Sequence, residues 1–287
     1  MVAATNLGED ANVTGPKLQA PPGATDTHMH FYGPYDRWPL PATSWNSPPE
    51  ATLDSYQEVQ KRLGLERVVV VQAAGYGYDN TVTMDNVGAI GEAARAVVVV
   101  PRGTDEAELD RLSRAGARGL RVFMLKGGVY DWADLPELAA MVKPFGWHLQ
   151  VQLDGRLLPE HVDALLGLDA QLVIDHTGKY LEPVDTDDPA FACLRRLVGA
   201  GAYVKLSAPY ETSKIGPPHY DDVGRLARVL VKDAPERMLW ASNWPHPGHA
   251  PKDDAMLLDT LLAWAPDEAD RRLILRDNPA RLYGFPG

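Results

Sequence analysis

The most constraining feature of the sequence is a short apolar segment that recurs about every 30 residues along most of the chain. The eight segments are rich in Val and Leu, and they lie at residues 24–32, 67–74, 96–102, 119–124, 148–154, 172–178, 203–210 and 237–245. Segments that are apolar on both faces are typical of parallel strands, because such strands are buried on both sides. The sequence therefore predicts eight buried parallel strands.

Helix-like segments lie between the strands, at residues 54–63, 105–115, 134–144, 159–166, 189–200 and 219–232. Several of them begin with Asp or Pro, which are favoured at helix starts. This alternation predicts an α/β fold, a (β/α)8 TIM barrel, with a doubly wound sheet as the alternative. We expect one barrel domain over residues 23–287, in which residues 266–276 add a C-terminal helix. Residues 1–22 read as an extended or mobile arm, and residues 31–45 as a lid or a subunit contact.

The composition narrows the classes of partner. Lys and Arg number 28 and Asp and Glu number 39, so the formal net charge is −11, which argues against binding to nucleic acid. The single Cys excludes an internal disulfide. No apolar stretch approaches the ~20 residues of a membrane span, and the N-terminus lacks the pattern of a secretory signal. We expect a cytoplasmic protein that acts on a small molecule and could form a homo-oligomer.

Polar residues at the ends of the predicted strands are candidates for catalysis, because barrel enzymes build their sites there. His28 and His30 are two residues apart at the end of the first strand, so they share a face and could hold a metal ion or a substrate oxygen. His176 follows the sixth strand. The alternatives are polar residues bonded under a loop for the first pair, and a buried structural histidine for His176.

The eighth strand ends in the sequence WASNWPHP, which contains Asn243 and His246. Asn243 can donate and accept hydrogen bonds, but it cannot act as a general base. His246 lies in the loop that follows, where it could bind substrate or form part of a structural turn.

Other polar residues could bind the substrate. Arg121 and Lys126 lie on and just after the fourth strand, and Tyr210 and Glu211 follow the seventh. Arg121 could bind a carboxylate or form a structural salt bridge, and Glu211 could bind hydroxyl groups or remain a solvated charge. Gln150 and Gln152 share one face of the fifth strand, which we expect to be the barrel lumen because amides facing apolar helices are costly.

Four segments carry a resemblance to a known family: DTHMH at 26–30, DHTG at 175–178, SNWPHP at 242–247 and DNPARLYGF at 277–285. From about residue 22 onward the chain resembles the lactone-processing branch of the amidohydrolase superfamily. The resemblance implies a distorted (β/α)8 barrel. In metal-dependent members, the first-strand histidines, later histidines and an eighth-strand Asp bind divalent ions.

This sequence departs from that pattern at two strands. Gln150 and Gln152 stand near the end of the fifth strand, where metal-binding members carry His, and Asn243 stands where they carry Asp. Because the branch includes metal-independent members, we expect a site without a metal ion or other cofactor. The alternative is a zinc or manganese ion held by His28, His30 and His176.

Lactone chemistry develops an oxyanion, which His28, His30, Arg121 or Lys126 could stabilise. Since Asn243 cannot activate water, it could instead orient a hydroxyl group of the substrate itself, while His176 moves the proton. The sequence therefore predicts a sugar-acid lactone isomerase that interconverts aldaro-1,5-lactone and aldaro-1,4-lactone. The alternatives are a hydrolase of a sugar-acid or dicarboxylate lactone, a metal-dependent decarboxylase and a non-catalytic binding barrel.

Overall fold

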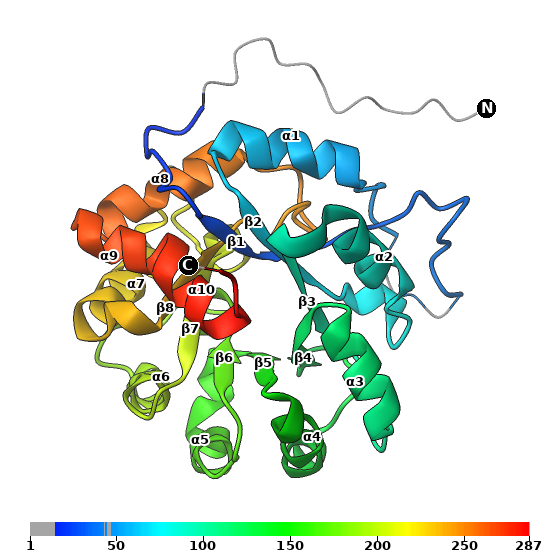
Figure 1. The fold of residues 1–287 in the computed structure, drawn as a ribbon. Helices are drawn as coiled ribbons and strands as arrows, with labels where there is room; N and C mark the ends of the chain where they lie inside the picture. The colour runs from blue at the N-terminus through cyan, green and yellow to red at the C-terminus, as the bar shows by residue number, and fades with distance from the viewer. Residues whose placement is uncertain (1–14, 43, 45–46, 287) are drawn as a thin grey trace.

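The computed structural model describes residues 15–42, 44 and 47–286, and its central feature is a sheet of eight parallel strands in chain order. The strands are β1 (Thr25–Met29), β2 (Arg67–Val71), β3 (Ala94–Val98), β4 (Ala117–Phe123), β5 (His148–Gln152), β6 (Leu172–Ile174), β7 (Tyr203–Ser207) and β8 (Met238–Ala241). Helices surround the strands as a ring (Figure 1). The predicted TIM barrel is confirmed, because a doubly wound sheet would reverse its strand order.

Hydrogen bonds between the first and last strands bring the two ends of the sheet together. The Thr27 hydroxyl donates to the Trp240 carbonyl at 2.8 Å. Beyond it, the Asn243 amide donates to the His28 carbonyl and the His30 amide to the Trp244 carbonyl, each at 2.8 Å. These bonds set the residues after β1 beside the residues after β8.

The helices that cover the strands are α1 (Leu53–Leu63), α2 (Thr81–Ile90), α3 (Glu106–Arg114), α4 (Leu135–Val142), α5 (Leu158–Leu166), α6 (Pro189–Gly199), α7 (Asp221–Asp233), α8 (Asp254–Trp264), α9 (Glu268–Arg272) and α10 (Asn278–Tyr283). Asp105, Asp188 and Asp253 cap helix starts by accepting backbone N–H groups, and of these Asp105 stands at the start of a predicted helical segment. The predicted helix over 266–276 is α9 and a wide turn that leads into α10.

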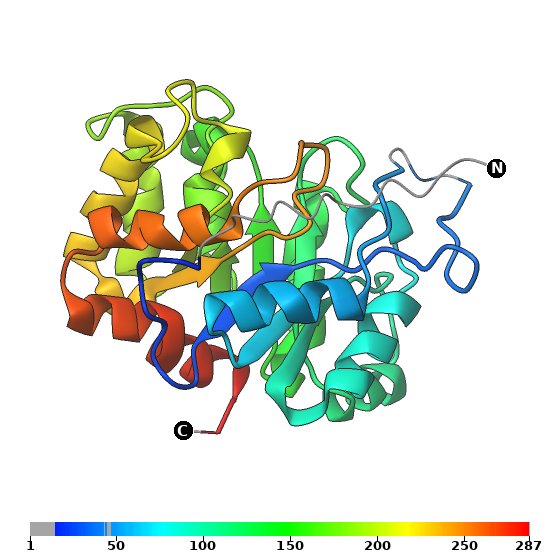
Figure 2. The same ribbon diagram turned by 90° about the horizontal axis from the view of Figure 1, so that it is seen from above.

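Alternate strand residues face opposite sides of the barrel wall. On β2, Val68 and Val70 pack under the helices, whereas Val69 and Val71 lie in a separate interior cluster. Tyr203 of β7 and Leu239 of β8 also belong to this interior cluster, and Tyr283 beside the barrel closes it. Figure 2 shows α10 at one end of the barrel and the loop after β8, in orange, at the other. The apolar end is thus packed shut, and the polar strand ends lie opposite.

The segment before β1 lies against α8. The backbone amides of Lys17 and Leu18 donate to the Asp259 carboxylate at 3.1 and 2.9 Å, and the Leu18 side chain is buried. Of the predicted arm over residues 1–22, residues 1–14 lie outside the described part of the chain. The predicted 31–45 segment is also described only in part, and its residue Tyr32 forms a bridge with Ala51.

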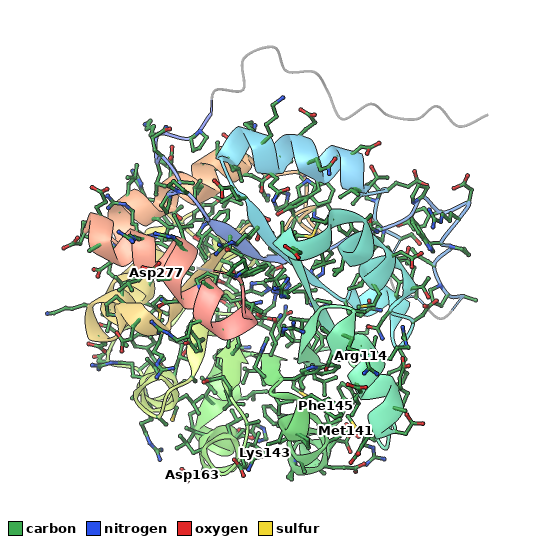
Figure 3. All side chains as sticks on the ribbon, viewed as in Figure 1. Arg114, Met141, Lys143, Phe145, Asp163 and Asp277 are labelled. Carbon is green, nitrogen blue, oxygen red and sulfur yellow. The ribbon has the colours of Figure 1, made fainter. Side chains whose placement is uncertain are left out.

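The charged residues lie mainly on the outer helices. Arg114 of α3 and Asp163 of α5 are exposed and lie toward the outside of the helix ring (Figure 3). Among the described residues, no helix has the length and apolar character that a membrane crossing requires.

Candidate active site

A cavity of about 310 Å³ opens above the carboxyl ends of the strands. Its lining combines five aromatic or His rings with buried cations and amides, and consists of His30, Tyr32, Ala74, Arg121, Phe123, Gln152, His176, Lys179, Leu181, Glu211, Asn243, Pro247, Gly248 and His249. Most of the polar residues predicted from the strand ends therefore meet in one place. A larger hollow of about 1150 Å³ lies between α1 and the loop after β8, and neither His28 nor His176 lines it.

His28 and His30 form a pair whose hydrogen positions follow from their partners. The His30 Nδ1 atom lies 2.8 Å from the Val71 carbonyl oxygen, which can only accept, so His30 carries its hydrogen on Nδ1. Its Nε2 atom is then an acceptor, and it lies 3.2 Å from His28 Nε2. Burial lowers the pKa of His30 to about 3 and also lowers that of His28, so both rings are neutral near pH 7.

Lys205 lies beneath this pair and is completely buried. Its Nζ atom donates to the Gln150 side-chain oxygen at 2.6 Å and to the Thr27 carbonyl at 2.7 Å. It lies 3.4 Å from His28 Nδ1. Burial lowers the pKa of Lys205 to about 8, whereas the nearby Asp175 carboxylate favours the charged form. The ammonium is therefore present near pH 7.

Sequence reasoning missed Lys205, although the signal was available. Tyr203, Lys205 and Ser207 alternate with Val204 and Leu206 along β7, so they share the inward face. The same alternation led to the prediction that Gln150 and Gln152 face the lumen. Both glutamines do so, but Gln150 contacts Lys205, His28 and Asp175 below the cavity instead of lining it.

His176 lies at a turn that begins directly after β6. It has a positive φ of 55°, as do Thr177 at 54° and Lys179 at 45°, a conformation that costs energy for residues other than Gly. The His176 Nδ1 atom lies 2.8 Å from the Ser207 hydroxyl. Burial lowers the His176 pKa well below its usual value, so the ring is neutral and can accept a proton.

Asn243, Glu211 and Lys179 form a chain of contacts along one wall of the cavity. The Asn243 side-chain nitrogen donates to the Tyr210 hydroxyl at 2.9 Å and to Glu211 Oε1 at 3.2 Å. The second carboxylate oxygen of Glu211 forms an ion pair with Lys179. Burial lowers the pKa of Lys179 to about 8. Both oxygens of Glu211 are therefore engaged.

Arg121 provides a second buried cation at the cavity. It donates to the Gln72 carbonyl at 2.6 Å and to the Gln152 side-chain oxygen at 2.9 Å. Its Nε atom has no hydrogen-bond partner among the described residues. This arrangement differs from a structural salt bridge to a surface acid, and it leaves the guanidinium charge available to an anionic ligand.

Four predicted substrate-binding residues do not line the cavity, namely Lys126, Gln150, Tyr210 and His246. Lys126 is exposed in the loop after β4. His246 is buried, but its Nε2 atom contacts Asp254 at 3.0 Å and its Nδ1 atom accepts the Lys252 amide at 3.2 Å. Both nitrogens of His246 are thus engaged by the loop after β8 and the start of α8, and its role in substrate binding stays a prediction. The predicted role of Lys126 in substrate binding also stays a prediction.

The residues beneath the cavity include possible ligands of a divalent metal ion and one cation that opposes it. Ligand atoms of His28, Asp175 and His176 lie within 4.8 Å of one another, which is close enough to share an ion. However, Lys205 Nζ lies 3.4 Å from His28 Nδ1 and 3.7 Å from Asp175 Oδ1. An ammonium group at this position repels a dication and already donates toward the ligand atoms. The residues therefore do not fit a divalent ion while Lys205 is in place.

The sequence of this chain is similar to a known family and to several known proteins. A sequence model of the family described as Amidohydrolase matches residues 25–285. The chain is 35% identical to a D-galactarolactone isomerase of Agrobacterium fabrum, over 94% of each chain. It is 34% identical to a 2-pyrone-4,6-dicarboxylate hydrolase of Comamonas testosteroni, over 95% of this chain and 94% of the relative. It is also 34% identical to a 4-sulfomuconolactone hydrolase of Rhizobium radiobacter, over 92% and 91%.

Solved structures share the fold. An apo structure from Agrobacterium tumefaciens superposes with a TM-score of 0.89 at 35% identity, covering 95% of this chain and 99% of the other. A zinc-bound amidohydrolase from Burkholderia multivorans gives a TM-score of 0.71 at 21% identity, covering 92% and 99%. At 21% identity, the similarity to the zinc-bound structure shows only a shared barrel fold.

Proposed function

The chain belongs to the amidohydrolase family, and from this premise we propose that it is an isomerase of sugar-acid lactones. The relatives described above act, by their names, on lactones or on a pyrone dicarboxylate, which supports a lactone as substrate. One observation favours isomerisation over hydrolysis: β8 leads into the neutral Asn243, and the Asn243 side chain binds Glu211. The proposed reaction interconverts the 1,5- and 1,4-lactones of an aldaric acid.

The charges of the cavity support an anionic substrate. Arg121 and Lys179 both line it, and a monolactone of an aldaric acid keeps one free carboxylate. A guanidinium and a carboxylate pair well because two parallel hydrogen bonds can form. The volume of about 310 Å³ suits a small molecule of this kind. We assign Arg121 and Lys179 to the substrate carboxylate, and Gln152 and Glu211 to its hydroxyl groups.

The proposed reaction is an intramolecular acyl transfer. The substrate's 4-hydroxyl oxygen attacks its own C1 carbonyl, and His176 accepts the hydroxyl proton. The carbonyl oxygen becomes an oxyanion, which the Nε2–H group of His28 stabilises when that oxygen replaces His30 Nε2 as its acceptor. The carbonyl then re-forms, the bond to O5 breaks, and His176 returns the proton to O5. Atoms and charges balance without water or a cofactor.

The wall opposite His176 favours this internal nucleophile over water. Asn243 can orient a hydroxyl group but cannot remove its proton. Glu211 is held by Asn243 on one oxygen and by Lys179 on the other. A bound hydroxyl of the substrate also has a high effective concentration at the carbonyl, which a diffusing water molecule lacks.

Hydrolysis of a lactone is the second candidate, and one observation favours it. Glu211 is a carboxylate at the cavity, and a carboxylate freed from its partners could activate water. Two of the relatives described above are named hydrolases.

Incubation of a galactaro-1,5-lactone in water enriched in ¹⁸O distinguishes the two reactions. We expect NMR to show the 1,4-lactone as the first product, and mass spectrometry to find no ¹⁸O in it. Open-chain acid that carries one ¹⁸O, with no 1,4-lactone before it, would refute the isomerase and support the lactonase. A blank without enzyme corrects for spontaneous opening of the ring.

A further inference from the structure

We propose that Lys205 is a built-in cation that takes the position a divalent metal ion would need, and that it acts as a positioning residue by keeping the His28 proton on Nε2. The proposal starts from a geometric conflict. Three side chains offer ligand atoms close enough to share an ion, and a fourth places an ammonium group against two of them. Nothing in the mechanism above uses Lys205, although it is completely buried at the centre of the barrel.

Each of the three N–H bonds of the Lys205 ammonium group has an acceptor atom nearby. Two of them are directed to oxygens that can only accept, the Thr27 carbonyl at 2.7 Å and the Gln150 side-chain oxygen at 2.6 Å. The third is left for His28 Nδ1 at 3.4 Å. Because its oxygen binds Lys205, Gln150 turns its nitrogen to the same His28 Nδ1 atom, at 3.2 Å. Two donors therefore converge on one ring nitrogen, which must accept.

The acceptor role of His28 Nδ1 determines which nitrogen donates in each of the two histidines. With Nδ1 accepting, neutral His28 carries its hydrogen on Nε2 and donates it to His30 Nε2, 3.2 Å away. His30 in turn donates from Nδ1 to the Val71 carbonyl. The other His28 tautomer would direct an N–H bond toward the ammonium group, and it would leave two bare Nε2 lone pairs facing each other. Both ends of the chain thus favour the same tautomer.

Asp175 balances the charge of this centre. Its Oδ1 atom lies 3.7 Å from Lys205 Nζ, and its Oδ2 atom accepts from the Gln150 nitrogen at 3.1 Å. Asp175 also lies 3.3 Å from His28 Nδ1, where an Nδ1–H tautomer would suit it. Two donors, the Lys205 ammonium group and the Gln150 amide, favour an accepting Nδ1, whereas Asp175 alone favours a protonated one. A dication added here would meet Lys205 and Arg121 with one carboxylate to offset all of them.

The consequence for catalysis rests on the proposed function. When the lactone carbonyl oxygen replaces His30 Nε2 as the acceptor, His28 is already the donor, so no proton has to move first. A bound metal ion polarises a carbonyl through its charge. Here the Nε2–H group supplies the polarisation, and Lys205 increases it by holding a positive charge at the far side of the ring.

Zinc titration by calorimetry tests the occupancy of the position. We expect no stoichiometric zinc binding by wild type or by the surface control Lys143→Met. We expect Lys205→Met to bind zinc at least ~100-fold more tightly than wild type, because it removes a positive charge that lies 3.4 Å from His28 Nδ1 and 3.7 Å from Asp175 Oδ1. Adding His176→Ala to that variant should abolish the gain. Equal zinc affinities in wild type and Lys205→Met, or one zinc bound by wild type and lost in His176→Ala, would overturn the proposal.

Nitrogen NMR of ¹⁵N-histidine-labelled wild type tests the tautomer without any Lys205 variant. The His28 signals are assigned by their loss in His28→Gln. We expect a protonated Nε2 and an unprotonated Nδ1, and a proton on Nδ1 would overturn the proposal even if Lys205→Met fails to fold. Neither measurement uses a lactone. Their failure is therefore distinguishable from failure of the isomerase assay.

Discussion

At the scale of single residues, His176 has its two ring nitrogens in different surroundings. Nδ1 is paired with Ser207 at 2.8 Å, and the ring lines the cavity. We predict that His176→Ala lowers kcat at least ~10²-fold, because the proton acceptor is lost. Ser207→Ala should cause a smaller loss, since the ring remains but loses the partner that orients it. The exposed His219 provides a control, and near-normal turnover in His176→Ala would remove His176 from the mechanism.

Lys179 sets the predicted dependence on pH. Burial lowers its pKa to about 8, with Asp175 opposing the shift and Arg121 adding to it, and the Glu211 ion pair also favours the charge. Because the pKa is lowered, Lys179 is charged below about pH 8 and neutral above it. We predict that kcat/KM for an anionic lactone falls as the pH rises through about 8.

The variant Lys179→Met separates this effect from other titrations. We expect it to have a lower kcat/KM at neutral pH and a weaker alkaline decline, because Lys205, whose pKa burial also lowers to about 8, still loses its charge in this range. An unchanged alkaline decline in Lys179→Met would show that another group is responsible. Spontaneous lactone opening, measured without enzyme, is subtracted at each pH.

At the scale of strands and helices, the sequence predicted the features that depend on the residue pattern of a single segment. Continuous apolar runs predicted the strands, and the position of His28, His30, His176 and Asn243 at the strand ends predicted their meeting in one site. The distant pairings could not be predicted, because they depend on side-chain contacts across the barrel. Lys205 and Gln150 lie 55 positions apart in the chain yet bond at 2.6 Å. The contact between His246 and Asp254 could not be predicted either, because Asp254 belongs to α8, which no predicted segment covered.

The turns after β5 and β6 are packed so closely that one position requires Gly. A Cβ atom on Gly155 would lie 2.4 Å from the Gly178 carbonyl oxygen and 2.6 Å from the Tyr180 ring. Gly178 ends the turn that carries His176. We therefore predict that Gly155→Ala destabilises the fold by about 1–3 kcal/mol and also lowers kcat, because the turn must shift.

The exposed Gly88 of α2 is the matched control, since nothing lies within 4 Å of a Cβ atom added there. Gly88→Ala should stabilise the fold by about 0.5–1 kcal/mol and leave kcat unchanged. Urea unfolding and steady-state kinetics measure both effects. Equal stability of Gly155→Ala and wild type would contradict the close packing of the two turns.

At the scale of the whole molecule, the barrel separates charge from apolar packing. The formal net charge of −11 arises from all charged residues of the chain, whereas the cavity lining holds the cations Arg121 and Lys179 against one acid, Glu211. The overall charge therefore says nothing about the charge of the ligand. At the opposite end, the interior is apolar and closed by the C-terminal segment, in which Tyr283 and Phe285 pack against β-strand residues.

Tyr283 tests how much this closed end contributes to stability. Its side chain is completely buried, its ring packs edge-on against His148 at 5.2 Å, and its hydroxyl has no hydrogen-bond partner among the described residues. We predict that Tyr283→Ala lowers the free energy of unfolding by about 3–5 kcal/mol, because it opens a large cavity in the core.

Tyr283→Phe should leave the free energy of unfolding within about 1 kcal/mol of wild type or raise it, because an unpaired buried hydroxyl contributes no bond that could be lost. Urea unfolding of both variants, followed by Trp fluorescence, gives the two values. A loss in Tyr283→Phe as large as in Tyr283→Ala would show that the hydroxyl, and not the ring, holds the end closed. The two variants together thus separate hydrogen bonding from packing at the closed end of the barrel.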